Sequence, residues 1–543
     1  MPKGLMHPHH EGLKEINRTR NRFKTTWPYD HSRVILKGDS KHDYINANFI
    51  NSYTKEKAYI ASQGPKRNTV RDFWHMIWQE SVSIIVMVTN LEEGERHKCD
   101  QYWPSEVNSP MGLDTYRLVM TSEKHKSVYN YRCLAITSRK TNMQREVHHF
   151  HFTQWPDHGV PDTVKLVAFY RKYQCQSYAQ DGPLLVHCSA GVGRTGTFIA
   201  IDALYSHGKT AGEIDVMEYV QMMRKDRMNM IQTHEQYKAV FEALLELFTV
   251  PDTSIPTSVF RGFLEEQDHE LLPSNQKLYR KQFQRLQSMR PSYTKDVYSA
   301  SVHPKNSTKN SDTSIFAHDR YRPYLTSPVR NSNDYINAVI IPGFLVDYGF
   351  LVTQCPLNST VVDFWTMIYD HDCELIVLMD NPNVNAQILP DDETPFVFER
   401  LSVHKDNGIS ETDECVILKD ETNKISRKVY ILTYNEWNED TLIPISPNLF
   451  INFHKKMKSY GQTCAGKVTA VCRDGCSKCG LYVAISLVLE KMELDNEIDI
   501  FQIVRSIQVR RPEFFPRYEQ YEFCYKFVRD YCLAEEESLY ANT

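Results

Sequence analysis

The segment HCSAGVGRTG, residues 187–196, contains the residue types of a phosphate-binding nucleophile. An apolar run leads into Cys188, and small residues, two glycines and Arg194 follow it. Successive backbone N–H groups in such a turn can point inward and bind a tetrahedral oxyanion, especially where a helix begins. The planar Arg194 guanidinium can hold two phosphate oxygens. Because this positive field favours a thiolate, the segment predicts attack of Cys188 on phosphorus and a phosphocysteine intermediate.

The predicted phosphate contacts come from the turn between the cysteine and the arginine. They are Ser189, Ala190, Gly191, Val192 and Gly193. The alternative is a buried cysteine beside an ordinary glycine-rich turn. The preceding strand, the glycines, Arg194 and the helix start all occur in order, and together they disfavour that alternative.

The segments that position this loop predict an α/β fold. SIIVMVTN (83–90) and PLLVHCS (183–189) have the length and apolar character of buried strands. TVRDFWHMIWQE (69–80) and TGTFIAIDALYSH (195–207) carry apolar residues at helical spacing. We therefore expect a twisted mixed central sheet flanked by helices on both faces.

The chain contains this predicted domain twice. Asp43 in HDYINANFI recurs as Asp334 in NDYINAVII, 291 residues later, and HEQYKAVFEAL recurs 284 residues later as YEQYEFCYKFV. A cluster of Pro, Ser and Thr near 249–259 marks the boundary. We expect two tandem copies, the first over 1–250 and the second over 263–535. A linker would cover 251–262, and an acidic tail 536–543.

Length and composition restrict the function. A chain of 543 residues with net charge −5 and pI near 6.5 fits several domains and is not basic enough for a nucleic-acid surface. The longest apolar run is too short to span a membrane, and the N-terminus lacks the apolar stretch of a signal peptide. Thirteen cysteines without a disulfide rhythm indicate reduced thiols and a cytoplasmic location.

HCSAGVGRTG resembles the signature of the classical protein tyrosine phosphatases. The tandem arrangement resembles the cytosolic part of the receptor-type members of that family. Other matching motifs begin at Tyr29 (YDHSRV), Asp43 (DYINAN), Lys98 (KCDQYWP), Phe152 (FTQWPDHGVP) and Ile231 (IQTHEQY).

The resemblance implies roles for several further residues. Asp157, in the loop QWPDHGVP, would be the general acid that protonates the leaving tyrosine oxygen. Gln232 and Gln236 would hold the water that hydrolyses the phosphocysteine, although Gln236 could be a helix-surface residue. Thr195 would donate its hydroxyl to the leaving thiolate, unless it only caps the helix. Glu93 would orient the loop arginine, unless it is a solvated loop residue.

The resemblance also implies a pocket wall that admits only the long phosphotyrosine side chain. In RNRFKTTW, Phe23 stands where the family has a tyrosine, and its ring can still stack on the substrate ring. Thr25 stands where the family has Asn or Asp that binds the peptide backbone. This exchange puts the peptide preference in doubt, while catalysis should survive.

The second copy has lost much of this chemistry. In VCRDGCSKCG (471–480), Cys472 replaces Cys188, and Lys478 offers a point charge where Arg194 offers a planar fork. Glu439 aligns with the general acid but lacks the proline before it, and Pro516 aligns with Gln232. We predict an inactive copy that either packs against and stabilises the first or binds a phosphopeptide or regulatory partner.

The cysteine spacing in this degraded loop also allows another interpretation. Cys472, Cys476 and Cys479 are spaced as in enzymes that hold an iron–sulfur cluster. The repeat argues against a cluster, because the three cysteines fall on positions of the phosphate loop. We therefore predict no metal and no cofactor.

The sequence thus predicts an enzyme that hydrolyses phosphotyrosine in proteins. The first alternative is a non-catalytic phosphotyrosine-binding scaffold, and the second is a phosphatase for lipids or phosphoserine. Expected partners are phosphotyrosine proteins and, for the second copy, a regulatory protein, without nucleic acid or a membrane span. The chain is either a soluble member or the cytosolic part of a single-pass receptor.

Overall fold

The computed structural model describes residues 4, 6–38, 42–157, 159–175, 182–269, 277–327, 332–344, 349–380, 387–391, 394–406, 414–438, 440–461, 464 and 466–541. Residue contacts divide the chain into two compact units, Met1–Asp252 and Thr253–Thr543. Within the described residues, no helix is both long enough and apolar enough to cross a membrane.

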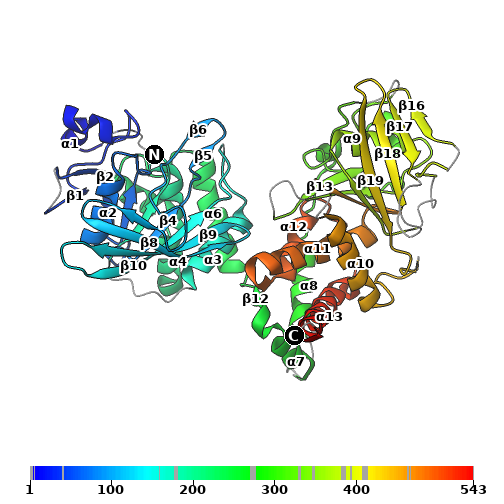
Figure 1. Ribbon diagram of the computed structural model, residues 1–543. Coiled ribbons are helices and arrows are strands. Elements are labelled where there is room, and N and C mark those ends of the chain that lie inside the picture. The colour runs from blue at the N-terminus through cyan, green and yellow to red at the C-terminus, as the bar shows by residue number, and fades with distance from the viewer. Residues whose placement is uncertain are drawn as a thin grey trace. The chain divides into compact units, whose positions relative to one another are not determined.

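The first unit is built on a mixed nine-stranded sheet (Figure 1). Its order is β1-β2-β3-β11-β4-β10-β9-β8-β7. The four central strands β3, β11, β4 and β10 are parallel, and the outer pairs are antiparallel. The strands are β1 (Arg33–Ile35), β2 (Tyr44–Ile50), β3 (Tyr59–Ser62), β4 (Ile84–Met87), β7 (Pro110–Gly112), β8 (Tyr116–His125), β9 (Tyr129–Ser138), β10 (Gln144–Phe152) and β11 (Leu184–His187), with a separate hairpin of β5 (Glu92–Glu93) and β6 (Arg96–His97).

Helices cover both faces of this sheet. They are α1 (His10–Leu13), α2 (Val70–Gln79), α3 (Thr163–Gln174), α4 (Gly193–Ala211), α5 (Val216–Asp226) and α6 (His234–Thr249). In β4, Ile84 and Val86 join the core formed with α3 to α6, whereas Ile85 and Met87 join the core formed with α2. Strand β4 is therefore apolar at every position, as expected for a strand buried on both faces.

The elements predicted from hydrophobic spacing are confirmed. SIIVMVTN contains β4, PLLVHCS contains β11, TVRDFWHMIWQE contains α2 and TGTFIAIDALYSH lies in α4. Helix α4 begins at Gly193, two residues before the predicted start at Thr195. It ends before Gly212, whose φ of 77° gives the left-handed cap typical of a helix C-terminus.

The second unit repeats the architecture with an eight-stranded sheet of order β13-β14-β20-β15-β19-β18-β17-β16. This order matches that of the first sheet from β2 onward, which confirms the predicted duplication. The strands are β13 (Ala338–Pro342), β14 (Gly349–Gln354), β15 (Leu375–Leu378), β16 (Phe396–Phe398), β17 (Leu401–Lys405), β18 (Glu414–Asp420), β19 (Ile425–Thr433) and β20 (Val468–Cys472).

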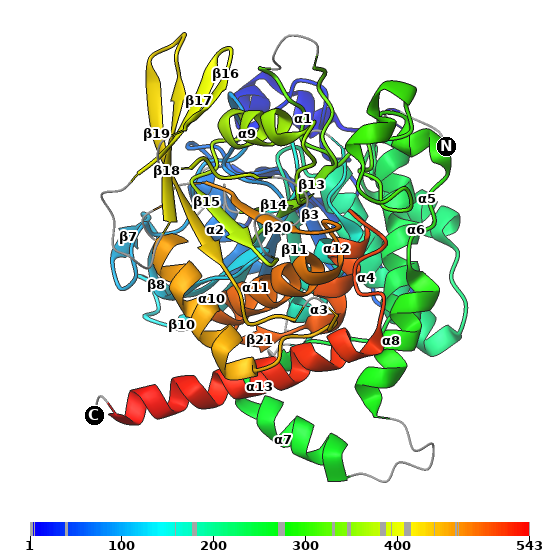
Figure 2. The ribbon, with the colours of Figure 1, turned by 90° about the vertical axis from the view of Figure 1, so that its right-hand side faces the viewer.

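The second unit also contains α-helices. They are α7 (Thr257–His269), α8 (Leu278–Met289), α9 (Val361–Asp370), α10 (Pro447–Gly461), α11 (Ser477–Asp495), α12 (Ile500–Gln508) and α13 (Tyr518–Ala541). Figure 2 shows α9 on one side of strands β13 to β15 and α10, α11 and α13 on the other. Phe364 and Trp365 of α9 are buried against the sheet.

The segments predicted as a linker and as an acidic tail contain regular structure. Within the predicted linker 251–262, β12 (Ile255–Pro256) pairs with β21 (Glu497–Ile498), and α7 follows at once. Pairing satisfies the backbone groups of a Pro- and Ser-rich stretch that composition alone marks as a boundary. Helix α13 continues to Ala541, through most of the predicted acidic tail 536–543.

A chain of buried polar side chains lies behind the end of β11. The Tyr102 hydroxyl oxygen is 2.7 Å from His187 Nε2 and 2.8 Å from His149 Nε2. Arg132 Nη1 lies 3.3 Å from His149 Nδ1, and His187 Nδ1 lies 3.2 Å from the Cys188 carbonyl oxygen. One set of tautomers satisfies every link: Arg132 donates to His149, His149 to Tyr102, Tyr102 to His187, and His187 to the Cys188 carbonyl.

Burial keeps the histidines of this region neutral. It lowers the pKa of His187 to about 4 and that of His151, which lies 2.8 Å from the Thr89 carbonyl oxygen, to about 3. Burial also lowers the pKa of His149 well below its usual value. A neutral ring can donate with one nitrogen and accept with the other, and the series of hydrogen bonds from Arg132 to Cys188 requires both.

We predict that acidification from pH 7 to pH 5 destabilises the first unit. These histidines stay neutral in the folded state, but in the unfolded chain they bind protons below about pH 6.5. The stabilisation is therefore complete above that pH and is lost as the pH falls toward the folded pKa values, by ~1.4 kcal/mol per pH unit for each histidine. The free energy of unfolding, measured with urea on the whole chain at several pH values, checks this.

The matched variants are His151→Asn and His125→Asn, since His125 is an exposed histidine of β8. His151→Asn should flatten the pH dependence by about one proton, while His125→Asn leaves it unchanged. Equal pH slopes for the parent chain and His151→Asn would contradict the prediction.

Candidate active site

The segment after β11 wraps around a thiol. Cys188 follows β11 directly, is buried, and its Sγ accepts a hydrogen bond from the Gly191 N–H at 3.3 Å. Gly191 has φ 72°, and a Cβ there would lie 2.2 Å from the Ser62 carbonyl oxygen. This position therefore requires glycine both for its left-handed backbone and for the close approach of β3.

The carbonyl groups of this turn all bind partners on its outer side. The Gly64 N–H donates to the Ser189 carbonyl, and the Ile231 N–H donates to the Val192 carbonyl. Arg227 donates to the carbonyls of Ala190 and Gly191 between them. All four hydrogen bonds are 2.8–3.2 Å long. Carbonyls that bind outward leave the N–H groups free to form a concave nest that accepts an anion. We call residues 188–194 the phosphate loop.

Arg227 is the buried anchor of the phosphate loop. Its side chain is fully buried, and its Nη1 and Nη2 donate to the Oδ1 atoms of Asn48 and Asn46 at 2.6 and 2.9 Å. Burial lowers the pKa of Arg227 to about 10, so the guanidinium remains charged at neutral pH. Both asparagines belong to β2, so one side chain connects that strand to the loop.

Arg194 is held in place by Glu93. Its Nη1 and Nη2 lie 2.6 and 2.8 Å from the two carboxylate oxygens of Glu93, which is buried. Burial alone would raise the pKa of Glu93, but hydrogen bonds from Arg194, Asn90 and Thr89 outweigh it and lower the pKa. Glu93 is thus a buried ionised partner of Arg194 and not a solvated loop residue.

Asp157 lies at the rim of the phosphate loop. Arg194 Nη2 donates to the carbonyl of Pro156 at 3.1 Å, and its guanidinium lies 5.5 Å from the Trp155 ring centre. Lys98 Nζ lies 2.7 Å from Asp157 Oδ1 and 3.4 Å from Glu93 Oε2. Lys98 belongs to the motif KCDQYWP, and the sequence predicted no role for it.

Gln232 and Gln236 approach the same loop from the start of α6. A Cβ on Gly193 would lie 2.8 Å from the Oε1 atoms of both glutamines. Gln236 is buried, and its Oε1 accepts from the Gln232 N–H at 2.9 Å, so it is not a helix-surface residue. Gln232 is exposed and adjoins a hollow of about 500 Å³ whose lining also includes Arg224 and Tyr237.

Thr195 lies inside α4, where Val192 and not Thr195 is the N-cap. Its hydroxyl is fully buried and has no hydrogen-bond partner among the residues that the structure describes. A buried hydroxyl without a partner is costly, so a group that it can serve is expected nearby. Helix capping, one of the two sequence interpretations, does not account for this residue.

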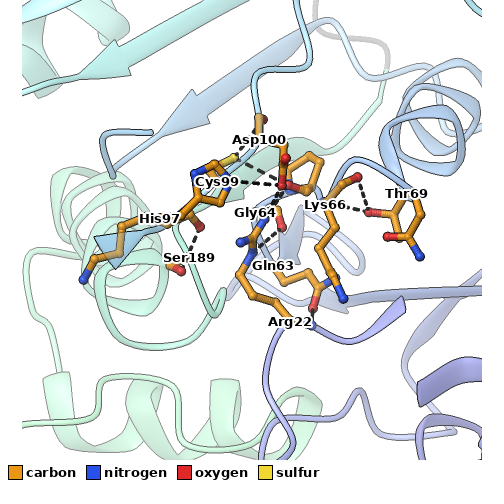
Figure 3. A network of polar contacts seen from close by, with 12 residues as sticks. Arg22, Gln63, Gly64, Lys66, Thr69, His97, Cys99, Asp100 and Ser189 are labelled. Carbon is orange, nitrogen blue, oxygen red and sulfur yellow. Dashed lines mark hydrogen bonds and ion pairs between the residues drawn. The ribbon is translucent and has the colours of Figure 1, made fainter. Parts of the chain in front are cut away.

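Phe23 follows Arg22, whose side chain binds a network of polar groups (Figure 3). Arg22 donates to the carbonyls of Gly64 and Pro65 at 3.1 and 2.6 Å and to Asp100 at 3.1 Å. The N–H of the same Gly64 donates to the Ser189 carbonyl. Two hydrogen-bonded steps therefore connect the segment that carries Phe23, which is 39% exposed, to the phosphate loop.

The corresponding loop of the second unit is occupied by its own carboxylate. Asp474 Oδ1 accepts from the N–H groups of Cys476 and Ser477 at 2.8 and 3.0 Å and lies 3.2 Å from Cys472 Sγ. Asp474 stands at the position of Ala190. The amides that would receive a phosphate are therefore satisfied internally.

The positive charge of this second loop is also neutralised. Lys478 is buried, and its Nζ lies 2.5 Å from Asp380 Oδ1. The outer scaffold persists, because Arg511 donates to the Gly475 carbonyl and to Asn337, as Arg227 does to the Gly191 carbonyl and to Asn46. Within the described residues, Cys472, Cys476 and Cys479 do not form a group with ligand atoms within 4.8 Å of one another.

Sequence reasoning missed the residues that support the phosphate loop from its outer side and the carboxylate inside the corresponding loop of the second unit. Arg227, Tyr102, Arg22 and Asp474 were not singled out. A signal existed for Arg227, because Arg511 repeats it at the same 284-residue offset as the glutamine-bearing segment. Tyr102 gave no comparable signal, because buried tyrosines are common and its partners are distant in sequence.

Comparisons with known proteins agree with this geometry. The family model described as protein-tyrosine phosphatase matches residues 17–246 and 306–530. The chain is 34% identical to receptor-type tyrosine-protein phosphatase F of Danio rerio and to type S of Gallus gallus, and 33% identical to type U of Gallus gallus. These alignments cover 95–96% of the chain but 28–37% of the relatives, so the chain spans about a third of their length. The chain belongs to the protein-tyrosine phosphatase family.

Proposed function

We propose that the first unit hydrolyses phosphotyrosine in proteins through a phosphocysteine on Cys188. The observation that carries this proposal is a buried thiol inside a loop in which the carbonyls of residues 189–192 all accept hydrogen bonds on the outer side. Such a loop presents its N–H groups to the phosphate, and the Glu93-held Arg194 supplies a fork for two of the phosphate oxygens. The site and the family agree on this chemistry.

In the first step, the Cys188 thiolate attacks phosphorus, and the bond from phosphorus to the tyrosine oxygen breaks. Asp157 donates its proton to that oxygen, so tyrosine leaves as a neutral phenol. The Arg194 contact with Pro156 draws the acid loop toward the phosphate. Asp157 pairs with Lys98 in the structure, so this contact must open before the carboxyl delivers a proton to the substrate.

In the second step, a water oxygen attacks phosphorus and the sulfur–phosphorus bond breaks. Asp157, now a carboxylate, takes a proton from this water, and inorganic phosphate leaves. The side chains of Gln232 and Gln236, which meet beside Gly193, hold the water. The buried Thr195 hydroxyl donates to the thiolate as it leaves and thereby gains the partner it otherwise lacks.

Substrate choice follows from the position of Phe23. Its ring forms a wall of the pocket, so a substrate must be long and flat enough to pass it and reach Cys188. Phosphotyrosine meets this condition, whereas phosphoserine is too short. The exposed Thr25 offers a weaker acceptor to the substrate backbone than Asn or Asp would.

For the second unit we propose an inactive, phosphatase-like role. Asp474 fills the loop and Asp380 neutralises Lys478, so a phosphate would have to displace a carboxylate already bound by two amides. Pro516 replaces the water-holding amide of Gln232. Glu439, the expected counterpart of Asp157, lies outside the described residues. A regulatory partner for this unit stays a prediction, as does placement of the chain on the cytosolic side of a receptor.

Hydrolysis of phosphotyrosine peptides by the whole chain tests the assignment. Cys188→Ser should lower the rate more than about 10⁴-fold, and Asp157→Asn about 10²–10⁴-fold. The matched control Cys472→Ser should leave the rate unchanged, and phosphoserine peptides should not be hydrolysed. An inactive parent chain whose Cys188→Ser variant still binds the phosphopeptide would replace the enzyme with a phosphotyrosine-binding scaffold.

The anchoring of Phe23 predicts a binding defect in Arg22→Ala. Loss of the hydrogen bonds to Gly64, Pro65 and Asp100 frees the pocket wall, so KM for a phosphotyrosine peptide should rise about 10-fold while kcat changes little. Arg18→Ala is the control, because exposed Arg18 pairs only with exposed Glu15 among the described residues. A fall in kcat at unchanged KM would show that Arg22 acts on the phosphate loop and not on substrate binding.

The carboxylate in the second loop predicts that Asp474→Ala opens an anion site. In a Cys188→Ser background, anionic iodoacetate should alkylate Cys472 faster after Asp474→Ala, relative to neutral iodoacetamide. Asp474→Asn retains an acceptor oxygen for the two amides and should keep the loop closed. Mass spectrometry of the Cys472 peptide gives both rates. An unchanged ratio of the two reagents in Asp474→Ala would contradict the prediction.

A further inference from the structure

Three potential metal ligands meet on the sheet of the first unit, apart from the phosphate loop. They are Cys133 of β9 and Glu146 and His148 of β10, with ligand atoms all within 4.8 Å of one another. The parallel strands β4, β10 and β11 run toward the phosphate loop. His148 pairs with Ile84, the first residue of β4, so the cluster lies at the other end of these strands.

The pairing of β9 with β10 places the three side chains on one face. Cys133 is the direct cross-strand partner of His148, and Glu146 is two residues earlier on the same strand. Directly opposite residues have Cβ atoms about 4.5–5.5 Å apart, and residues i and i+2 share a face. His148 Nε2 lies 3.4 Å from Glu146 Oε1. Zinc–ligand distances of about 2.0–2.3 Å place tetrahedral ligands roughly 3.3–3.7 Å apart, so small side-chain shifts complete the geometry.

The surroundings orient these ligands. The Tyr131 hydroxyl oxygen lies 2.9 Å from His148 Nδ1, which leaves Nε2 turned toward Glu146. A ligating histidine commonly has its second nitrogen held in this way, and the hydrogen bond fixes its tautomer and ring orientation. Thr121, in the bulge of β8, donates to the Cys133 carbonyl at 3.3 Å.

Burial differs between the ligands in a way that suits an ion. Cys133 and His148 are 8% and 7% exposed, whereas the Glu146 side chain is 62% exposed. The sulfur and the imidazole thus belong to buried residues, whereas the carboxylate lies on the solvent-exposed side of the cluster. An ion can enter from solvent and keep a water in the fourth position.

We propose that Cys133, Glu146 and His148 bind one Zn²⁺ ion with a water as the fourth ligand. Sulfur with imidazole selects a zinc-like ion over Mg²⁺ or Ca²⁺, which prefer oxygen ligands. On binding, the Cys133 thiol releases its proton to solvent, and the sulfur forms the bond to zinc. The ion fastens β9 to β10, the strand that leads into the loop of Asp157.

Cobalt binding tests the site, because a thiolate ligand gives Co²⁺ a charge-transfer band and tetrahedral coordination gives strong visible bands. The whole chain with Cys188→Ser, treated with a chelator, should bind one equivalent of Co²⁺ with both features, and one equivalent of Zn²⁺ should remove them. The Cys188→Ser background excludes the nucleophile as the ligand. Zinc should also raise the unfolding temperature of this protein.

Three variants discriminate this site from other thiols. Cys133→Ser should abolish the charge-transfer band, and Glu146→Gln should weaken zinc binding about 10-fold or more. The matched control Cys175→Ser removes an exposed cysteine of the same unit and should change nothing. Absence of the band, or its survival in Cys133→Ser, overturns the proposal. If Cys133→Ser does not fold, unchanged zinc affinity in Glu146→Gln, whose side chain is exposed, overturns it equally.

Discussion

The pairing of one buried guanidinium with backbone carbonyls is the interaction on which the site depends. Arg227 is fully buried, so each of its N–H groups needs an acceptor, and the loop carbonyls of Ala190 and Gly191 supply two. Removing one partner of a buried charge costs about 3–5 kcal/mol, which holds the carbonyls outward. The N–H groups must then face inward, toward Cys188. The inward-facing N–H groups, which can bind an anion, therefore result from the hydrogen bonds that the Arg227 guanidinium makes on the outer side of the loop.

In the second unit, the contacts that shape the turn are present, but the groups inside the turn differ from those of the first unit. Arg511 binds the Gly475 carbonyl and Asn337, so the turn keeps its shape, and Gly475 keeps a φ of 65°. Inside that turn, however, the Asp474 carboxylate takes the amides, and Lys478 is paired with Asp380. In this turn an internal carboxylate satisfies N–H groups of the loop, so the turn can fold without an external anion.

In the first unit, a short series of charged side chains connects Asp157, the proposed general acid, to the loop of Cys188, the proposed nucleophile. Glu93 binds Arg194 through both oxygens and also contacts Lys98, which in turn binds Asp157. Arg194 contacts the backbone of Pro156 as well. The loop arginine and the acid are thus positioned by a shared set of partners. A change in the loop that carries Pro156 and Asp157 should therefore alter the position of Arg194.

The sequence by itself determined the α/β fold, the duplication and the identity of the phosphate loop. These features depend on local pattern: apolar runs of strand length, helical spacing, glycines between a cysteine and an arginine, and a repeat at 284–291 residues. It also identified Asp157, Gln232 and Gln236 as candidates, through motifs that lie far apart in the chain. Glu93 and Thr195 remained ambiguous, because burial decides between their alternatives.

Only the tertiary structure decided which groups surround the loop. Arg227, the chain from Arg132 to His187, and Arg22 act through contacts between residues 17 to 181 positions apart, which no local pattern reveals. The position of the Asp474 carboxylate was equally invisible, since an aspartate in a turn is usually solvated. Cys133 and His148 became a pair only through the register of two strands. Sequence pattern fixes what each segment can form, whereas the partners of a buried polar group depend on the packing that brings distant segments together.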